Sequence, residues 1–210
     1  MQVAVLFSGG KDSVMAAFWA MNQGFTPILV TVKPPDYSMM FHHPNVEYTK
    51  LQAESMELSQ VFVETTEENW REKLIEKFKE LKVEGIVTGA IASEYQKRRI
   101  DSIGEELGIP TYAPLWHKGQ ETMQEMLDNL EIVVIAVSAE GLGPEFLGEP
   151  LQKIVDAKKP GIHTFLEGGE GETFVTNAPF FRKRIVVKKW KKNWDGVRGT
   201  AQIVEAYLEA

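Results

Sequence analysis

The stretch VAVLFSGGKDSVMAAFWA, residues Val3 to Ala20, combines an apolar run, a short polar loop and an amphipathic segment. The run from Val3 to Phe7 predicts a buried strand, and residues 12–23 predict a helix because their apolar side chains recur on one face. The loop SGGKDS, Ser8 to Ser13, joins the two. In open parallel sheets ligands bind beyond the carboxyl ends of the strands, so this loop predicts a binding site.

The composition of this loop is typical of a phosphate cradle. Its two glycines let the backbone approach an anion without a Cβ in the way, and the helix start that follows favours negative charge. Lys11 adds positive charge. The carboxylate of Asp12 repels phosphate unless a cation lies between them, which predicts a bridging Mg²⁺. We assign phosphate binding to the whole loop, which consists of Ser8, Gly9, Gly10, Lys11, Asp12 and Ser13.

Spacing separates this loop from two common nucleotide-binding motifs. A Walker A loop requires GxxxxGK[ST], which the sequence lacks. A dinucleotide fingerprint requires GxGxxG, whereas Gly9 and Gly10 are adjacent. The alternative without a ligand is a plain turn between a strand and a helix.

Strand and helix patterns alternate through the first part of the sequence. This alternation predicts an α/β fold with a doubly wound parallel sheet that carries helices on both faces. Further strands are predicted over residues 26–32, 60–63 and 85–88 and within 108–116, and a surface loop is predicted over 36–44.

Helix starts are indicated by polar residues at three places. We expect Asn45 to cap a helix that runs to about residue 58, and Thr65 with Glu68 to form a capping box for the next helix. Ser93 with Gln96 is expected to cap the helix that follows.

The pattern changes after about residue 128. Residues 131–137 form a β-branched strand pattern, and residues 183–192 and 200–208 read as an antiparallel hairpin with its turn at 193–196. We therefore predict two domains, a larger one over residues 1–128 that holds the loop and a smaller α+β domain over 129–210.

Composition excludes several classes of chemistry. The sequence has no cysteine, which rules out disulfides, thiolate metal sites and a persulfide carried on this chain. Its net charge of −7 disfavours nucleic acid as a partner, and we interpret the basic cluster in residues 182–192 as the solvated face of the hairpin. The longest apolar run, residues 14–21, is too short for a membrane span, and the N-terminus lacks a signal-peptide pattern. We expect a cytoplasmic protein.

A second candidate segment is GAIASEYQKRR, Gly89 to Arg99. Gly89 allows a close approach of the backbone, and Tyr95, Arg98 and Arg99 are expected on one helix face, where a guanidinium can hold a carboxylate or phosphate oxygen in bidentate fashion. The alternative is a solvated helix face with an ion pair between Glu94 and Arg98.

The third candidate is EGGEGET, Glu167 to Thr173. Crowded carboxylates raise one another's pKa or require a cation, so this loop suits an ammonium ion or an amine nucleophile. The alternative is an acidic surface turn.

These motifs together resemble a known family. SGGKDS is similar to the PP-loop of the ATP pyrophosphatases, of the adenine nucleotide alpha hydrolase-like type, which split ATP into AMP and pyrophosphate. With the GAI…YQ…R segment, the PLW segment that ends at Trp116, the GLGPEFLG turn and the acidic loop, the sequence resembles the diphthine–ammonia ligase family in its short archaeal-type form.

The resemblance implies a reaction and its participants. A member would use ATP and Mg²⁺ to adenylate the carboxylate of diphthine on elongation factor 2, and ammonia arriving as ammonium would complete the amide. We expect Trp116, Tyr95 and Phe174 to face the trimethylammonium group of diphthine. The predicted catalytic residues are Lys11, Asp12, Glu167, Glu170 and Glu172, and Asp12 is also the predicted metal ligand. Nucleotide contacts are predicted for the loop from Ser8 to Ser13 together with Phe7, Val32, Gly89 and Ala90. Substrate contacts are predicted for Tyr95, Arg98, Arg99, Trp116, Gly168, Gly169, Thr173 and Phe174.

The sequence departs from the family at one position of the acidic loop. Many relatives have tyrosine where Gly171 stands here. Two other functions remain as alternatives: a PP-loop enzyme that adenylates a tRNA base or a small carboxylate, and an ATP-binding module without catalysis. The sequence also leaves a homo-oligomer open.

Overall fold

The computed structural model describes residues 1–33, 45–91, 93–138, 140–163 and 165–209. The surface loop predicted over 36–44 lies outside these residues. The described residues form two compact units, the first drawn from 1–8, 12–42 and 57–117 and the second from 9–11, 43–56 and 118–210. The domain boundary predicted between residues 128 and 129 stays a prediction.

The first unit is built on a parallel sheet of five strands in the order β3-β2-β1-β4-β5. Each pair of neighbouring strands is parallel, with Val3 of β1 opposite Pro27 of β2 and Gly85 of β4. The predicted α/β class with a parallel sheet is confirmed. The elements that follow one another through this part of the chain are β1 (Gln2–Leu6), α1 (Lys11–Asn22), β2 (Thr26–Lys33), β3 (Ser59–Glu64), α3 (Trp70–Leu81), β4 (Gly85–Val87), α4 (Glu94–Leu107) and β5 (Thr111–Tyr112).

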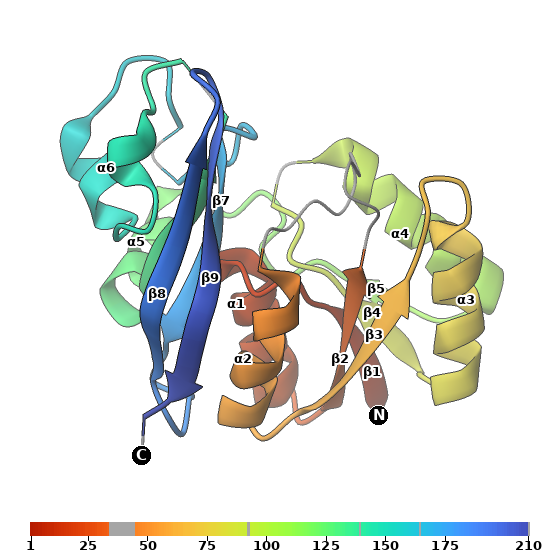
Figure 1. Ribbon diagram of the computed structural model, residues 1–210. Coiled ribbons are helices and arrows are strands. Elements are labelled where there is room, and N and C mark those ends of the chain that lie inside the picture. The colour runs from red at the N-terminus through yellow and green to blue at the C-terminus, as the bar shows by residue number, and fades with distance from the viewer. Residues whose placement is uncertain (34–44, 92, 139, 164, 210) are drawn as a thin grey trace. The chain divides into compact units, whose positions relative to one another are not determined.

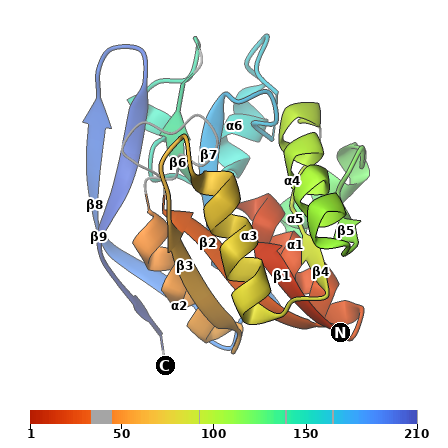
Figure 2. The ribbon, with the colours of Figure 1, turned by 90° about the vertical axis from the view of Figure 1, so that its right-hand side faces the viewer.

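Helices cover both faces of this sheet (Figure 1). On one face, Leu74 and Phe78 of α3 pack with Ile103 of α4 against Ala4 and Ile86 of the central strands. Figure 2 shows α3 lying across β3 and β2 on this side. The helix α1 lies on the opposite face (Figure 1). This core fixes the strand ends from which the predicted site residues follow.

Two predicted helix caps of this unit have different outcomes. Ser93 caps α4 as predicted, because its side chain accepts a hydrogen bond from the backbone N–H of Gln96. The capping box of Thr65 and Glu68 is wrong, since α3 begins at Trp70 with Asn69 as its N-cap. Thr66 and Asn69 instead form a turn before α3, in which the side chain of each accepts a hydrogen bond from the backbone N–H of the other.

The second unit contains an antiparallel sheet of four strands in the order β7-β6-β9-β8. The predicted hairpin is confirmed and forms a long ribbon (Figure 1), but its turn lies over residues 195–198 and not 193–196, because Asn193 and Trp194 still pair with β9. Its turn is closed by Asp195, whose carboxylate accepts from the N–H groups of Val197 and Arg198. Lysines 188, 189, 191 and 192 are exposed on β8, as the solvated face was predicted to be. The elements are η1 (Val46–Tyr48), α2 (Thr49–Ser55), α5 (Gln120–Asn129), β6 (Glu131–Val137), η2 (Pro144–Phe146), α6 (Gln152–Ala157), β7 (Gly171–Asn177), β8 (Ile185–Trp194) and β9 (Gly199–Leu208).

The helix α2 is attached to this antiparallel sheet although it comes from the N-terminal part of the sequence. Asn45 was expected to cap a helix, but its side chain makes no capping bond. It binds β9 instead, donating to Ala201 O over 2.9 Å and accepting from Ile203 N over 2.7 Å. At the other end, Ser55 Oγ donates to Lys183 O over 2.5 Å. Side-chain bonds therefore anchor α2 at both ends.

None of the helices in the described part of the chain combines the length and the apolar character that a membrane span requires.

Candidate active site

The loop from Ser8 to Ser13 joins β1 to α1, as predicted. Its ends are tied together, since Ser8 N donates to Ser13 Oγ over 3.2 Å and the two hydroxyl oxygens are 3.3 Å apart. Gly9 has a φ of 83°, in the left-handed region that glycine adopts without strain. The loop therefore forms a tight turn at the N-terminus of α1, where anions are favoured.

The middle of this loop is held by β7 and by the acidic segment that precedes it. Gly9 O accepts a hydrogen bond from Val175 N over 3.0 Å, and Lys11 N donates to Thr173 Oγ1 over 3.2 Å. The side chain of Lys11 is buried, and its Nζ contacts the Glu167 carboxylate. The structure thus brings Lys11, Glu167 and Thr173 together within the second unit.

Gly89 makes its close approach to the start of α1. A Cβ built on Gly89 would lie 2.7 Å from the carbonyl carbon and oxygen of Asp12 and 2.8 Å from Ser13 N. Because these are backbone atoms, the neighbours cannot give way cheaply and only glycine fits. Gly89 therefore supports the loop from Ser8 to Ser13 by letting the segment after β4 pack against the first turn of α1.

Three other predicted nucleotide contacts are buried within the first unit. The side chains of Phe7, Val32 and Ala90 are each less than a tenth exposed. Phe7 O already accepts a hydrogen bond from Thr31 Oγ1 over 2.8 Å. Because their side chains are buried, these residues can contact a nucleotide mainly through backbone atoms.

Glu170 closes the acidic loop on itself. One carboxylate oxygen accepts from His163 N and the other from Gly168 N, both over 2.8 Å. The loop is also joined to Ser138, whose N–H donates to Glu170 O and whose Oγ donates to Gly169 O over 2.9 Å. Glu170 therefore shapes the loop through its bonds to two backbone N–H groups.

Gly171, the residue after Glu170, packs closely against β6. Gly171 lies opposite Val137, and a Cβ on Gly171 would collide with Ala136 O. Any residue with a side chain at this position would require β6 to shift. Glu172 follows on β7 with its side chain exposed. Phe174 is fully buried, so it is a core residue of the antiparallel sheet and presents no ring face to a ligand.

The rings and guanidinium groups of α4 interact with one another. Arg99 lies over the Tyr95 ring, with its Cζ 3.8 Å from the ring centroid, and 5.8 Å from the centroid of Trp70. Tyr95 is 55% exposed. Arg98 forms the exposed ion pair with Glu94, over 3.1 Å, that was the alternative to a ligand-binding role. Arg99 is therefore held by aromatic contacts, whereas Arg98 is on a solvated face.

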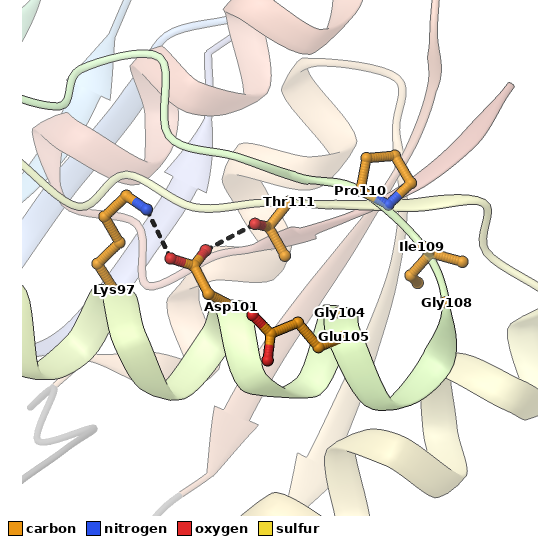
Figure 3. Close-up of a pocket in the computed structure, with 8 residues that line it drawn as sticks. All are labelled: Lys97, Asp101, Gly104, Glu105, Gly108, Ile109, Pro110 and Thr111. Atoms are coloured by element: carbon orange, nitrogen blue, oxygen red, sulfur yellow. Dashed lines mark hydrogen bonds and ion pairs between the residues drawn. The ribbon is translucent and has the colours of Figure 1, made fainter.

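Trp116 also has a cation of the protein over its ring. Lys97 Nζ lies 5.6 Å from the Trp116 centroid and 2.5 Å from Asp101 Oδ2. Thr111 Oγ1 donates to the other carboxylate oxygen of Asp101 over 2.6 Å. Lys97, Asp101 and Thr111 line a surface pocket beside α4 (Figure 3). Burial favours a higher pKa for Asp101, but the hydrogen bonds from Lys97 and Thr111 and the charge of Lys97 outweigh it and hold the pKa below 3.8.

Lys97 and Asp101 are absent from the predicted site residues. Their spacing of four on a helix was a usable signal, because side chains at i and i+4 are neighbours. Thr111 carried no such signal, since its bond to Asp101 depends on how β5 packs beside α4.

A metal site was predicted at Asp12 alone. Among the described residues, no group of three or more histidine, cysteine, aspartate or glutamate side chains could hold a metal ion. A single carboxylate fits Mg²⁺ in the way typical of phosphate-bound magnesium, which keeps water and substrate oxygens as its other ligands. The role of Asp12 as metal ligand stays a prediction.

Comparisons with known proteins extend over nearly the whole chain. The family models of the diphthamide synthase N-terminal and C-terminal domains match residues 1–111 and 118–208. The proteins named diphthine–ammonia ligase in Bos taurus and Homo sapiens are 33% and 32% identical to it, over 89% of this chain and 83% of each relative. Among solved structures, a protein titled "predicted subunit of tRNA methyltransferase" from Methanocaldococcus jannaschii is similar with a TM-score of 0.48 and 18% identity, over 85% of this chain and 98% of that one.

Proposed function

The chain belongs to the diphthamide synthase family, and from that premise we propose that it is a diphthine–ammonia ligase, an enzyme that converts the carboxylate of diphthine into the amide of diphthamide at the expense of ATP. The observation that carries this proposal is the match of both family models, one after the other, over residues 1–111 and 118–208. The substrate is diphthine on elongation factor 2, and the nitrogen comes from ammonia.

The reaction requires that the carboxylate be activated, because it cannot lose an oxide ion at neutral pH. A carboxylate oxygen attacks the α-phosphorus of ATP and pyrophosphate leaves. Ammonia then attacks the acyl carbon, AMP leaves with the shared oxygen, and the nitrogen loses a proton to give the amide. The enzyme has to neutralise charge on the departing pyrophosphate, hold ammonia beside the acyl carbon and accept the proton.

The loop from Ser8 to Ser13 fits the role of holding the pyrophosphate end of ATP. The left-handed turn at Gly9, the helix start and the buried ammonium of Lys11 together favour an anion. Asp12 would hold Mg²⁺, which offsets negative charge on the phosphates when it is bound. Support comes from Gly89, whose packing against the Asp12 and Ser13 backbone leaves no room for a larger residue.

The acidic loop divides its carboxylates between two tasks. Glu170 holds the loop closed through two backbone N–H groups, so we assign it to positioning. Glu167 contacts the Lys11 ammonium and Glu172 is exposed at the start of β7. We assign to these two the binding of ammonium and the acceptance of its proton.

The trimethylammonium group of diphthine suits the aromatic rings of Trp116 and Tyr95. Each ring has a protein cation over it, Lys97 for Trp116 and Arg99 for Tyr95. A cationic substrate would bind by replacing that cation. The same reasoning does not extend to Phe174, whose ring is buried.

The setting of the reaction follows from its substrate. Elongation factor 2 acts in translation, so we place the enzyme in the cytoplasm. A homo-oligomer stays a prediction that sedimentation analysis would test. The alternatives, adenylation of a tRNA base or small carboxylate and ATP binding without catalysis, are less well supported because the relatives carry the ligase name.

Product analysis tests this proposal. The purified protein is mixed with ATP, ammonium and elongation factor 2 that carries diphthine, and nucleotides are separated by chromatography. We expect AMP and pyrophosphate in equal amounts, formed only when the protein substrate is present. Formation of ADP and phosphate, or AMP formation that tRNA rather than elongation factor 2 stimulates, would contradict it.

A further inference from the structure

Gln52 is a fully buried polar residue in α2 that the predicted site does not include. Its side-chain nitrogen donates to Gly9 O and to Val175 O, each over 2.8 Å. Both partners are carbonyl oxygens, which only accept hydrogen bonds, so the orientation of the amide is fixed by chemistry. One side chain therefore connects the phosphate loop to β7 across 43 and 123 residues of sequence.

The bond to Gly9 O controls the peptide group that follows. Gly9 O also accepts from Val175 N over 3.0 Å, so two donors hold this carbonyl. In a trans peptide the C=O and the next N–H point in opposite directions. Holding Gly9 O toward Gln52 and Val175 consequently sets the direction of the Gly10 N–H. The orientation of this peptide decides how the loop can meet a phosphate.

Lys11, two residues after Gly9, is also held by β7. Lys11 N donates to Thr173 Oγ1 over 3.2 Å, and Thr173 is buried. Thr173 and Val175 have side chains on the same face of β7, because alternate residues of a strand share a face. Two positions of the loop are thus held against one strand, with Gln52 completing the attachment from α2.

The packing around Gly9 shows how closely α2 approaches. A Cβ at Gly9 would collide with Gln52 Oε1 and would lie 2.9 Å from Thr49 Cγ2. The segment that carries Gln52 is anchored at both ends, because Asn45 binds Ala201 of β9 and Ser55 binds Lys183, which lies just before β8. A side chain that is anchored in this way can impose a conformation on the loop.

We propose that Gln52 and Thr173 are positioning residues for the phosphate loop, and that they set its affinity for the pyrophosphate end of ATP. This inference rests on the proposed function only in that the loop binds the phosphates of ATP. Gln52 is suited to the task because it supplies two uncharged donors from one nitrogen. Asparagine is a methylene shorter, and lysine would bring a charge into a buried site.

The test compares ATP with AMP, which lacks the β- and γ-phosphates. Affinities of the full-length protein for a non-hydrolysable ATP analogue and for AMP are measured by calorimetry for Gln52→Met and Thr173→Val, which keep the side-chain volume and remove the polar group. We expect about tenfold weaker binding of the ATP analogue, with AMP affinity changed by less than about twofold. Ser55→Ala is the matched control, since it removes the two hydrogen bonds between the hydroxyl of this helix residue and the backbone of Lys183 without touching Gly9. Its ratio of the two affinities should equal that of the wild type.

Loss of stability alone would not produce this result. If both folded variants bind the ATP analogue as the wild type does, or lose AMP affinity to the same degree, the positioning role is wrong. Should Gln52→Met fail to fold, Thr173→Val decides in the same way. A wild type that binds ATP but does not amidate diphthine would refute the proposed function and leave this comparison of affinities valid.

Discussion

The ammonium of Lys11 contacts the carboxylate of Glu167, although 156 residues separate them along the chain. Their side chains are only 4% and 15% exposed, so water screens the pair little. In the proposed function, the same ammonium is the positive charge that the loop from Ser8 to Ser13 offers to ATP. We expect phosphate to compete with Glu167 for Lys11, which would link occupancy of the loop to the state of the acidic loop.

Competition between Glu167 and phosphate for Lys11 predicts that Glu167→Gln raises the affinity for ATP and lowers kcat. In Glu167→Gln the carboxylate no longer competes for Lys11, and we expect about threefold or more tighter binding of an ATP analogue. The same variant should have a much lower kcat, since a carboxylate assigned to ammonium is lost. Calorimetry and steady-state AMP release measure the two quantities. Weaker ATP binding would show that Glu167 supports the phosphate site instead of competing with it.

Glu170→Ala tests whether this carboxylate is a positioning group. The backbone N–H groups of His163 and Gly168 would lose their acceptor, and we expect unfolding free energy to fall by about 1–3 kcal/mol in urea titrations. Glu170→Gln keeps one acceptor oxygen and should recover part of the stability and activity. If Glu170→Gln were as inactive as Glu170→Ala at full stability, Glu170 would have a direct role in the chemistry.

Asp101 makes stability depend on acid pH in a defined direction. Its pKa in the folded protein is below 3.8, so its ionised form favours folding. That contribution is complete above the unfolded pKa and is lost as pH falls through the folded value. We therefore expect the stability difference between the wild type and Asp101→Asn to be constant near neutrality and to shrink below about pH 4. Urea unfolding over a pH series measures it, and a difference that grows on acidification would contradict the assignment.

Trp116→Leu tests the aromatic contact proposed for the substrate. We expect about threefold to tenfold weaker binding of elongation factor 2 that carries diphthine, measured as KM at saturating ATP, because one cation–π contact is lost. Trp194→Leu is the matched control, since Trp194 is an exposed tryptophan on the hairpin, and its KM should be unchanged. An unchanged KM in Trp116→Leu would refute the contact.

Local sequence patterns predicted the first strand, its loop and the first helix because every signal for them lies within twenty residues. The hairpin of β8 and β9 was predicted for the same reason, as its turn residues and strand patterns are contiguous. Ser93 capped its helix as expected, with its partner Gln96 three residues away.

The misses depend on contacts between distant segments. Asn45 has the composition of a cap, but β9 provides better-placed partners in Ala201 and Ile203. Thr65 does not cap α3, because Thr66 and Asn69 form a turn and the helix begins only at Trp70. The attachment of α2 through Gln52 could not be predicted, since a buried glutamine has no sequence periodicity that reveals its partners.

The most direct measurement is the mass of the diphthine-bearing peptide of elongation factor 2 after incubation with this protein, ATP and ammonium. Replacement of the carboxyl OH by NH₂ should lower the peptide mass by about one dalton, and only when both ATP and ammonium are present. An unchanged mass, in the presence of active protein that binds ATP, would contradict the assignment of this chain as a diphthine–ammonia ligase.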